Sequence, residues 1–373
     1  MSQELNRENV LEALKHVIEP DLKKDLVTLN MIDNLTIEGK KVSFSIVLTT
    51  PACPLKEMMR KACIEAIHKH VDASAEMEIS FTSNVTTTRK QEPTLTGVKN
   101  IIAVASGKGG VGKSTVAANL AIALSATGAK VGLMDADIYG PSVPLMFGLT
   151  DAEPHMEGDG EGARIIPLEK YGIKVLSIGF FVDDTKALVW RGPMASSALK
   201  QLFFETNWGE LDYLICDLPP GTGDIHLTLV QSVPVTGAVI VTTPQEVALA
   251  DARKGIDMFH LEGINVPVLG LIENMSYFTP AELPENKYYI FGKDGGKKLA
   301  ESMNVPLLGQ IPLVQSIRES GDAGKPAALD TNSPVAIAFL EAAKNLAQQV
   351  SIRNATKEPT KIVEMQNGSS CGH

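Results

Sequence analysis

Residues 106–115 read SGKGGVGKST, and this stretch decides the fold. It fits the pattern G-x-x-x-x-G-K-[ST] at Gly107, Gly112, Lys113 and Ser114. The residues before it, NIIAVAS (100–106), are apolar and rich in β-formers. Those after it, VAANLAIALSA (116–126), repeat apolar residues at helical spacing. The sequence therefore predicts a strand, a glycine-rich loop and a helix, in that order.

A loop in this position forms an anion site. Backbone N–H groups converge on phosphate oxygens, the helix dipole favours negative charge, and glycines let the backbone approach closely. We expect Lys113 to reach the β- and γ-phosphates and the Ser114 hydroxyl to ligate Mg²⁺. The predicted ligand is a nucleoside triphosphate, ATP with Mg²⁺. The residues expected to hold it here are Gly107, Lys108, Gly109, Gly110, Val111, Gly112, Lys113, Ser114 and Thr115.

A second lysine, Lys108, lies inside the loop, where an ordinary phosphate loop needs no charge. The string GKGGVGKS resembles the deviant Walker A loop of the MinD/ParA/nitrogenase-reductase class of ATPases. In that class the early lysine reaches across a dimer interface to the partner's nucleotide, in the role of an arginine finger supplied in trans. The resemblance implies a homodimer in which Lys108 is catalytic. A solvated surface lysine is the alternative.

Length and composition limit the possible functions. The chain has 373 residues, enough for two or three domains, and a net charge of −10 from 34 basic and 44 acidic residues. This charge argues against broad contacts with nucleic acid or with anionic membranes. No apolar run approaches the ~20 residues of a spanning helix, and the N-terminus lacks the apolar core of a signal peptide. Four irregularly spaced cysteines indicate a reducing compartment, and we expect a cytoplasmic protein.

The first 83 residues form a unit with its own pattern. A helix is expected over 7–18, two strands over 31–37 and 41–49, a helix over 55–70 and a strand over 76–82. This α-β-β-α-β order resembles the small domain of iron–sulfur assembly factors, with Cys53 at a strand-to-helix turn in TTPACPLKEMM (49–59). The polar residues 84–96, which include Pro93, are expected to be a linker.

Strands and helices alternate over residues 97–350, which predicts an α/β domain with a mostly parallel sheet covered by helices. We expect strands at 101–105, 130–134, 213–216, 238–242 and 268–271, and helices at 113–126, 194–205, 247–259 and 334–350. An exposed loop is expected at 151–162. Residues 351–373 are polar and are expected to form a flexible tail.

Three further segments complete the predicted nucleotide site. Asp137 follows the strand in KVGLMDAD (130–137), at the sheet edge where a carboxylate can orient a water for attack on the γ-phosphate. Asp217 ends the strand YLICD (213–217), which resembles a Walker B strand, and the resemblance implies that Asp217 holds Mg²⁺ through a water. Asn274, in LGLIENMSYF (269–278), offers an amide that can read the adenine edge. Strand-capping aspartates and a turn-forming asparagine are the alternatives.

Several strings resemble the Mrp/ApbC branch of iron–sulfur cluster carrier ATPases. They are MDADIYGPSVPLMFG (134–148), WRGPM (190–194), DLPPGTGDIHLTL (217–229) and ENMSYF (273–278). The resemblance implies an ATPase that assembles or carries a 4Fe-4S cluster and delivers it to apoproteins, with assembly proteins as further partners.

One departure from that branch concerns the cluster ligands. Its members commonly carry a C-x-x-C pair after ENMSYF, and two chains then supply four thiolates. Here the chain continues TPAELPENKYYIFGKDGG (279–296), without cysteine. Two other cysteines are candidate cluster ligands in place of the missing pair. One is Cys371, in the terminal GSSCGH, and the other is Cys53, whose thiol pKa a helix N-terminus would lower. A frayed end and a structural thiol are the respective alternatives.

Three functions follow from these observations. The first is a homodimeric Mg·ATPase that assembles or transfers iron–sulfur clusters. The second is an ATPase adaptor of the same pathway without a cluster of its own. The third is a spatial-organisation ATPase of the cell-division or plasmid-partition type, which normally shows a basic helix or face that this sequence lacks.

Overall fold

A computed structural model of the chain describes residues 4–89, 95–181, 192–280, 282–283 and 285–362. The chain divides into two compact units, each with its own hydrophobic core. The small unit comprises Met1–Thr86 together with Ser351–Lys357, and the large unit comprises Thr87–Val350 together with Glu358–His373.

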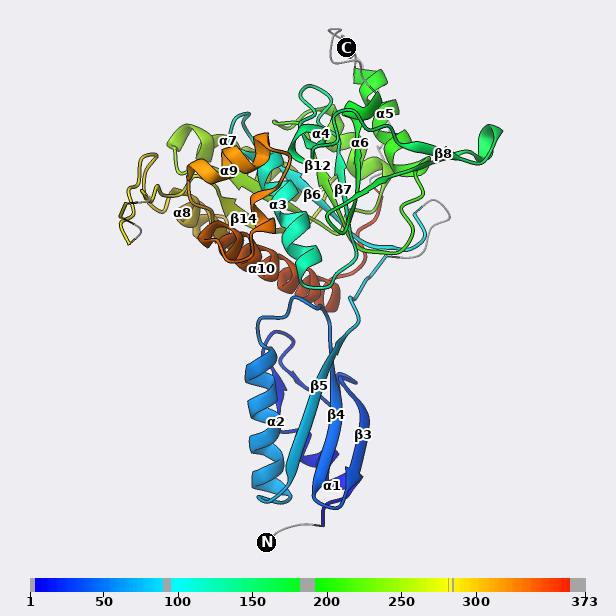
Figure 1. The fold of residues 1–373 in the computed structure, drawn as a ribbon, viewed down its shortest axis with the longest axis vertical. Helices are drawn as coiled ribbons and strands as arrows, with labels where there is room; N and C mark the ends of the chain where they lie inside the picture. The colour runs from blue at the N-terminus through cyan, green and yellow to red at the C-terminus, as the bar shows by residue number, and fades with distance from the viewer. Residues whose placement is uncertain (1–3, 90–94, 182–191, 281, 284, 363–373) are drawn as a thin grey trace, which may run out of the picture. The chain divides into compact units, whose positions relative to one another are not determined.

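The small unit has the expected order of helices and strands, with an added two-residue hairpin. Its elements are α1 (Arg7–Leu14), β1 (Ile18–Glu19), β2 (Lys24–Asp25), β3 (Ile32–Glu38), β4 (Lys41–Leu48), α2 (Lys56–His70) and β5 (Glu76–Ser83). β4 lies in the middle of a three-stranded sheet, antiparallel to β3 and parallel to β5. Helix α2 runs along this sheet (Figure 1).

Helix α1 is shorter than its apolar periodicity predicted. It begins where the Asn6 side chain accepts the backbone N–H of Asn9, at 2.9 Å. It ends at Leu14 instead of reaching residue 18, because Ile18 and Glu19 pair with β2. Tertiary pairing therefore overrides the local helical pattern at this point.

The large unit contains a sheet of eight strands in the order β10-β11-β7-β12-β6-β13-β14-β15. All neighbours are parallel except the edge strand β10, which is antiparallel to β11. This arrangement confirms the α/β class with a mostly parallel sheet. The strands are β6 (Val98–Ala105), β7 (Val131–Asp135), β10 (Leu168–Lys170), β11 (Ile173–Ser177), β12 (Leu211–Asp217), β13 (Gly237–Thr242), β14 (Val268–Glu273) and β15 (Leu307–Gln310).

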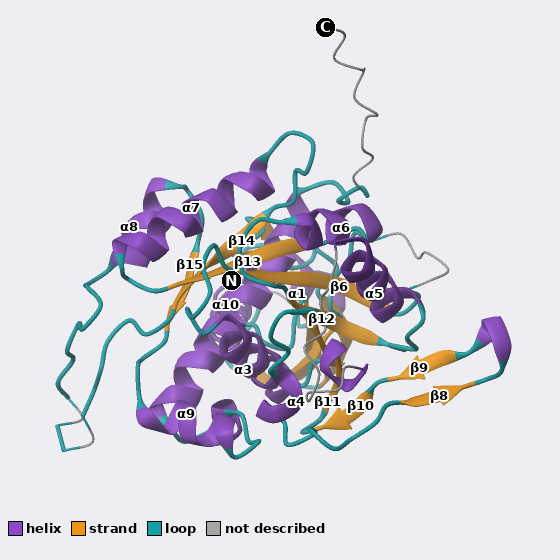
Figure 2. Cartoon of the chain, turned by 90° about the horizontal axis from the view of Figure 1, so that it is seen from above, coloured by secondary structure: helices purple, strands orange, loops and turns teal. Residues whose placement is uncertain are grey.

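Helices cover both faces of this sheet. Figure 2 shows α7 and α8 on one side and α3, α9 and α10 on the other. The helices are α3 (Lys113–Ala126), α4 (Val143–Met146), α5 (Gly192–Phe204), α6 (Asp224–Ser232), α7 (Glu246–His260), α8 (Gly295–Ser302), α9 (Gln315–Asp322) and α10 (Pro334–Thr356). Short 3₁₀ turns lie at Gly160–Gly162, Ile178–Phe181 and Ala327–Leu329. Within the described residues, no helix is both long and apolar enough to span a membrane.

The strand order brings the predicted site residues to one edge of the sheet. β12 lies between β6 and β7, so the carboxyl ends of these three parallel strands are adjacent. The loop of residues 106–112 follows β6, Asp137 follows β7, and Asp217 ends β12. Ligands of open α/β sheets bind at this edge, outside the carboxyl ends of the strands.

Helix α10 corrects the expected boundary of the C-terminal tail. The helix continues to Thr356, six residues into the segment 351–373 that was expected to be flexible. Polar composition misled the prediction, because Ser351 and Arg353 are buried and Asn354 Nδ2 donates to the Thr86 carbonyl at 2.9 Å. Residues 363–373 lie outside the described part of the chain.

The segment 151–162 is exposed, as expected, but it is not wholly a loop. It contains β8 (His155–Glu157), which pairs antiparallel with β9 (Arg164–Ile166). This hairpin projects from the body of the large unit (Figure 2).

Candidate functional site

The loop between β6 and α3 presents its backbone donors without internal partners. Among the described residues, none accepts a hydrogen bond from the backbone N–H groups of residues 107–112. Gly112 caps α3 with φ of 79°, in the left-handed region. A Cβ at this position would lie 2.3 Å from Asn274 Nδ2, so only glycine fits. The loop therefore offers a row of free donors at a helix N-terminus.

Two hydrogen bonds hold the beginning of this loop. Ser106 Oγ donates to the Lys108 carbonyl at 3.0 Å, and the Gly221 N–H donates to the Ser106 carbonyl at 2.8 Å. The second bond joins the loop to the segment that follows β12. Because of this bond, the Gly221 N–H is not a free donor like those of residues 107–112. The side chain of Lys108 is exposed.

Lys113 lies at the centre of the site, with only 6% of its surface exposed. Its Nζ atom lies 2.6 Å from Asp217 Oδ1 and 3.5 Å from Asp137 Oδ2, and it donates to Ser114 Oγ at 3.3 Å. Three predicted site residues thus meet around the Lys113 ammonium group: Ser114, its neighbour in the sequence, and Asp137 and Asp217 from distant parts of the chain. Burial raises the pKa of Asp217, and the charge of Lys113 opposes this rise.

The second oxygen of Asp217 has no partner. Asp217 is fully buried, and its Oδ2 atom has no hydrogen bond within the described residues. A buried carboxylate oxygen ordinarily accepts a hydrogen bond or binds a cation. Together with the neighbouring hydroxyl of Ser114, this oxygen fits the hard oxygen ligands that Mg²⁺ prefers.

Asp135 shapes the loop that carries Asp137. It is fully buried and accepts the Asp137 N–H at 3.1 Å, the Val143 N–H at 3.2 Å and Ser177 Oγ at 2.9 Å. Burial, reinforced by the charge of Asp217, raises the pKa of Asp135 to about 7. Ser177 was not among the predicted residues. It ends the apolar string IKVLS (173–177), a pattern that favours a strand. In the structure this strand, β11, pairs with β7.

Asn274 contacts the loop from the other side. Its side chain is 5% exposed, and Nδ2 donates to the Val111 carbonyl at 2.8 Å. Its own backbone N–H donates to the Thr242 carbonyl at 2.8 Å, which ties the end of β14 to β13. With Nδ2 occupied, the carbonyl oxygen of the side chain remains as an acceptor.

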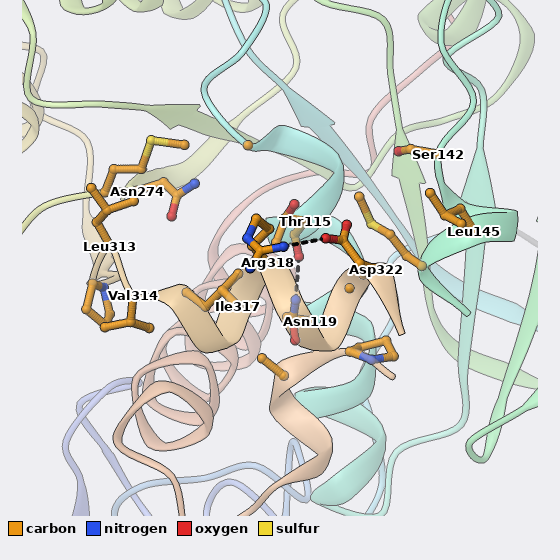
Figure 3. Close-up of a pocket in the computed structure, with 18 residues that line it drawn as sticks. Thr115, Asn119, Ser142, Leu145, Asn274, Leu313, Val314, Ile317, Arg318 and Asp322 are labelled. Carbon is orange, nitrogen blue, oxygen red and sulfur yellow. Dashed lines mark hydrogen bonds and ion pairs between the residues drawn. The ribbon is translucent and has the colours of Figure 1, made fainter. Parts of the chain in front are cut away.

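A cavity of about 290 Å³ opens beside the loop, between α3 and α9 (Figure 3). Gly112, Thr115 and Asn274 line one end of it, and Arg318 and Asp322 form an ion pair at its wall, at 2.9 Å. Most of its walls are apolar side chains that the sequence had not singled out: Leu145, Met146, Met275, Pro312, Leu313, Val314 and Ile317. The apolar run IPLV (311–314), which follows β15, was the one sequence pattern that could have indicated part of this apolar wall.

His226 is a buried residue near the site whose ring is unsatisfied. It lies on α6, is 2% exposed, and packs edge-on against Phe259 with ring centroids 6.5 Å apart. Neither ring nitrogen has a hydrogen-bond partner within the described residues. Burial, with a contribution from the charge of Lys113, lowers the pKa of His226 to about 4.

The buried His226 should make the large unit sensitive to acid. Between pH 6.5 and 4 the unfolded chain binds a proton that the folded chain does not, so the free energy of unfolding falls as pH falls. From pH 7.5 to 5.5, wild type should lose about 1.3 kcal/mol more than His226→Leu. Urea unfolding followed by tryptophan fluorescence measures this difference, because both tryptophans lie in the large unit. His155→Leu, on the exposed hairpin, should behave as wild type; equal pH dependence of all three proteins would contradict the assignment.

Of the two cysteines considered as iron–sulfur ligands, only Cys53 lies within the described residues. Cys53 is half-buried, and burial raises its pKa, whereas a helix N-terminus was expected to lower it. The residue before α2 makes no side-chain cap, and desolvation outweighs the backbone hydrogen bond from Leu55. Cys371 lies outside the described residues. Within the described part, no group of three or more His, Cys, Asp or Glu side chains could hold a metal ion.

Comparisons with known proteins agree with this geometry. The sequence model of the ParA family, described as NUBPL iron-transfer P-loop NTPase, matches residues 97–350. That of the FeS_assembly_P family, described as iron-sulfur cluster assembly protein, matches residues 7–81. These two ranges correspond to the bodies of the large and small units.

Whole-chain relatives give the same result. Proteins named iron-sulfur cluster carrier protein are 49% identical in Synechocystis, over 93% of this chain and 99% of the relative, and 46% identical in Deinococcus radiodurans, over 95% and 98%. A solved nucleotide-binding protein from Archaeoglobus fulgidus, in complex with ADP, is 36% identical with a TM-score of 0.56, and the match covers 66% of this chain and 94% of that one. The chain therefore belongs to the ParA family of NUBPL-type iron-transfer P-loop NTPases, among the iron–sulfur cluster carrier proteins.

Proposed function

We propose that this protein is a cytoplasmic Mg·ATPase that acts as a nucleotide-switched homodimer and delivers iron–sulfur clusters to apoproteins. The observation that carries the proposal is the convergence of Lys113, Asp137 and Asp217 at the edge of the sheet, below a loop of free N–H donors. The name shared by the relatives supplies the cargo.

The loop and its lysine bind the phosphates in this proposal. The N–H groups of residues 107–112 and of the first turn of α3, which includes Ser114 and Thr115, point toward the phosphate oxygens. Lys113 exchanges the Asp217 oxygen for the β- and γ-phosphates. Ser114 Oγ and, through a water, the unpartnered oxygen of Asp217 are the atoms that would hold Mg²⁺, which would supply positive charge beside the phosphates.

Asp137 is the group proposed to orient the attacking water. One of its carboxylate oxygens accepts the N–H of Tyr139 at 3.3 Å, and the other faces Lys113. These contacts hold the carboxylate next to Lys113, the residue proposed to bind the γ-phosphate. Positioning of this kind supplies most of the catalysis in phosphoryl transfer.

The cavity beside the loop is proposed to take the nucleoside. Its apolar walls suit a stacked base, and the Asn274 carbonyl oxygen is the polar group at its end near the loop. A carbonyl oxygen accepts from the exocyclic amino group of adenine, whereas the 6-oxo group of guanine would face it with an acceptor. We infer that the site prefers ATP to GTP.

Lys108 is proposed to act in a second copy of the chain. Its side chain is exposed, and among the described residues no carboxylate lies within ion-pair distance of its amino group. Lys113, in the same loop, is by contrast buried between carboxylates. An unpaired cation at the mouth of the site is free to reach the nucleotide of a facing protomer.

An iron–sulfur cluster would need ligands from more than one chain. The described residues of one chain supply no multi-ligand site, so thiolates from two chains, with Cys53 or Cys371, would have to hold a cluster. The same observation favours the second candidate function, an ATPase adaptor that carries no cluster of its own.

Anaerobic reconstitution with iron and sulfide tests the cargo. A carrier should develop a visible thiolate-to-iron charge-transfer band, and the variant that lacks the ligand, Cys53→Ser or Cys371→Ser, should lose it. Cys63→Ser is the matched control, because Cys63 is fully buried in the core of the small unit. Mg·ATP hydrolysis is measured on the same samples. Hydrolysis without any band in wild type would favour the adaptor, and absence of hydrolysis would overturn the ATPase assignment.

A further inference from the structure

Glu273, the residue before Asn274, is a fully buried carboxylate with no counter-ion. Its exposed fraction is 0%, and among the described residues no lysine or arginine lies within ion-pair distance of it. Three hydrogen bonds satisfy its oxygens instead. Ser276 Oγ and Gln310 Nε2 donate to Oε1, the second at 2.8 Å, and the Gly296 N–H donates to Oε2. Burying a carboxylate costs free energy unless its oxygens accept hydrogen bonds, so we asked what these bonds do for the rest of the site.

The three donors belong to different parts of the large unit. Gly296 lies in the first turn of α8, whose dipole favours a carboxylate, and Gln310 ends β15. The approach of α8 is close, because a Cβ on Gly296 would lie 2.8 Å from Glu273 Oε2. Backbone bonds add to the contact, since the Ile311 N–H donates to the Glu273 carbonyl at 2.9 Å. Glu273 therefore joins the end of β14 to both β15 and α8.

Asn274 makes the corresponding contacts on the side of the phosphate loop. Its Nδ2 atom donates to the Val111 carbonyl and packs on Gly112. Consecutive residues thus link α8 and β15, through Glu273, to the phosphate loop, through Asn274. Because the two side chains share one stretch of backbone at the end of β14, the anchor at Glu273 fixes the place from which Asn274 faces the cavity.

We propose that Glu273 is a positioning residue for base recognition, which holds the Asn274 carbonyl oxygen where it meets the amino group of adenine. The inference rests on the proposed role of Asn274 in the nucleotide site. Loss of the carboxylate leaves the Gly296 N–H without an acceptor and leaves Gln310 Nε2 only its longer bond to Asp294 Oδ1, at 3.4 Å. A buried unpaired donor is relieved by movement of the segment that carries it. The end of β14 then shifts, and Asn274 with it.

The test compares the affinities of ADP and IDP, measured by calorimetry with Mg²⁺. IDP has an oxygen where ADP has the amino group, so the ratio of the two affinities reports base reading and not general binding or folding. Wild type should prefer ADP at least tenfold, about the value of one well-made hydrogen bond. Glu273→Leu should reduce the preference to less than threefold. Glu273→Gln should keep most of it, because the amide oxygen still accepts from Gly296 while Ser276 and Gln310 can reorient toward the new NH₂ group.

Matched variants separate positioning from mere stability. Glu19→Leu removes a buried carboxylate of the small unit that accepts the Leu22 N–H, and the ADP preference should not change. Asn274→Ala should abolish the preference, and Glu273→Leu with Asn274→Ala should lower it no further. If Glu273→Leu does not fold, Gly296→Ala, which presses on the same carboxylate, takes its place.

The possible outcomes are distinguishable. If Glu273→Leu keeps the wild-type preference for ADP, the positioning role is overturned while the ATPase proposal stands. A wild type that does not distinguish ADP from IDP would overturn base reading by Asn274 and the positioning role together. Absence of Mg·ATP hydrolysis with the ADP preference intact would overturn the ATPase and leave Glu273 in its role.

Discussion

Replacing Lys108 with alanine should lower ATP turnover by about 10³-fold and leave nucleotide affinity within about threefold of wild type. The side chain is exposed and unpaired in the described structure, so its removal disturbs neither the loop nor the core. An ammonium supplied by a second protomer neutralises charge that develops during phosphoryl transfer and contributes little before it. The loss should therefore appear in kcat and not in the dissociation constant.

The control for this experiment is Lys254→Ala, which removes a lysine of α7 whose side chain is 74% exposed. It should hydrolyse ATP as wild type does. Sedimentation with Mg²⁺ and a non-hydrolysable ATP analogue should show dimers for wild type and for both variants. Undiminished turnover in Lys108→Ala, or a wild type that stays monomeric under these conditions, would refute action in trans.

Replacing Lys113 with methionine should destabilise the ligand-free protein by about 3 kcal/mol, in addition to abolishing phosphate binding. Within the described residues, this ammonium is the only positive group at ion-pair distance from the Asp137 and Asp217 carboxylates. Asp217 is fully buried, so the variant must bury an unpaired charge or protonate it. Urea unfolding at pH 7.5, followed by tryptophan fluorescence, measures the loss.

Two comparisons make this prediction specific. Lys113→Met combined with Asp217→Asn should recover much of the lost stability, because the second change removes the unpaired charge. Lys99 forms a pair of similar length with Asp212, at 2.9 Å, but one that is partly exposed, so Lys99→Met should cost less than about 1 kcal/mol. Equal losses in Lys113→Met and Lys99→Met would show that burial of the pair at the site is not what stabilises it.

The sequence predicted the centre of the site because its chemistry is local. A strand, a glycine loop and a helix are contiguous, and α3 was predicted with its observed bounds, Lys113–Ala126. Asp137 and Asp217 could be placed together because parallel strands carry their ends to one edge of the sheet. The roles proposed for Asp137 and Asp217 remain predictions, and the variants described above test those of Lys108 and Asn274.

The walls of the cavity could not be predicted, because no local pattern marks them. Helix α9 is short, polar and without a buried residue, yet Ile317 and Arg318 line the cavity beside the loop. The edge strands β10 and β15 have only three and four residues, too few for a periodicity to be recognised. The direction of the Cys53 pKa shift was predicted wrongly for a related reason: burial is a property of the whole small unit, whereas the helix start is visible in the sequence.

The pairing of Lys113 with Asp217 also bears on selectivity against small anions. Orthophosphate or sulfate that binds in the phosphate loop must displace the Asp217 carboxylate from Lys113, and the exchange of one anion for another gains little free energy. A nucleotide that places its base in the apolar cavity between α3 and α9, as proposed above, would recover the loss by burying that base. The pairing of Lys113 with Asp217 should therefore favour nucleotides over small inorganic anions in the phosphate loop.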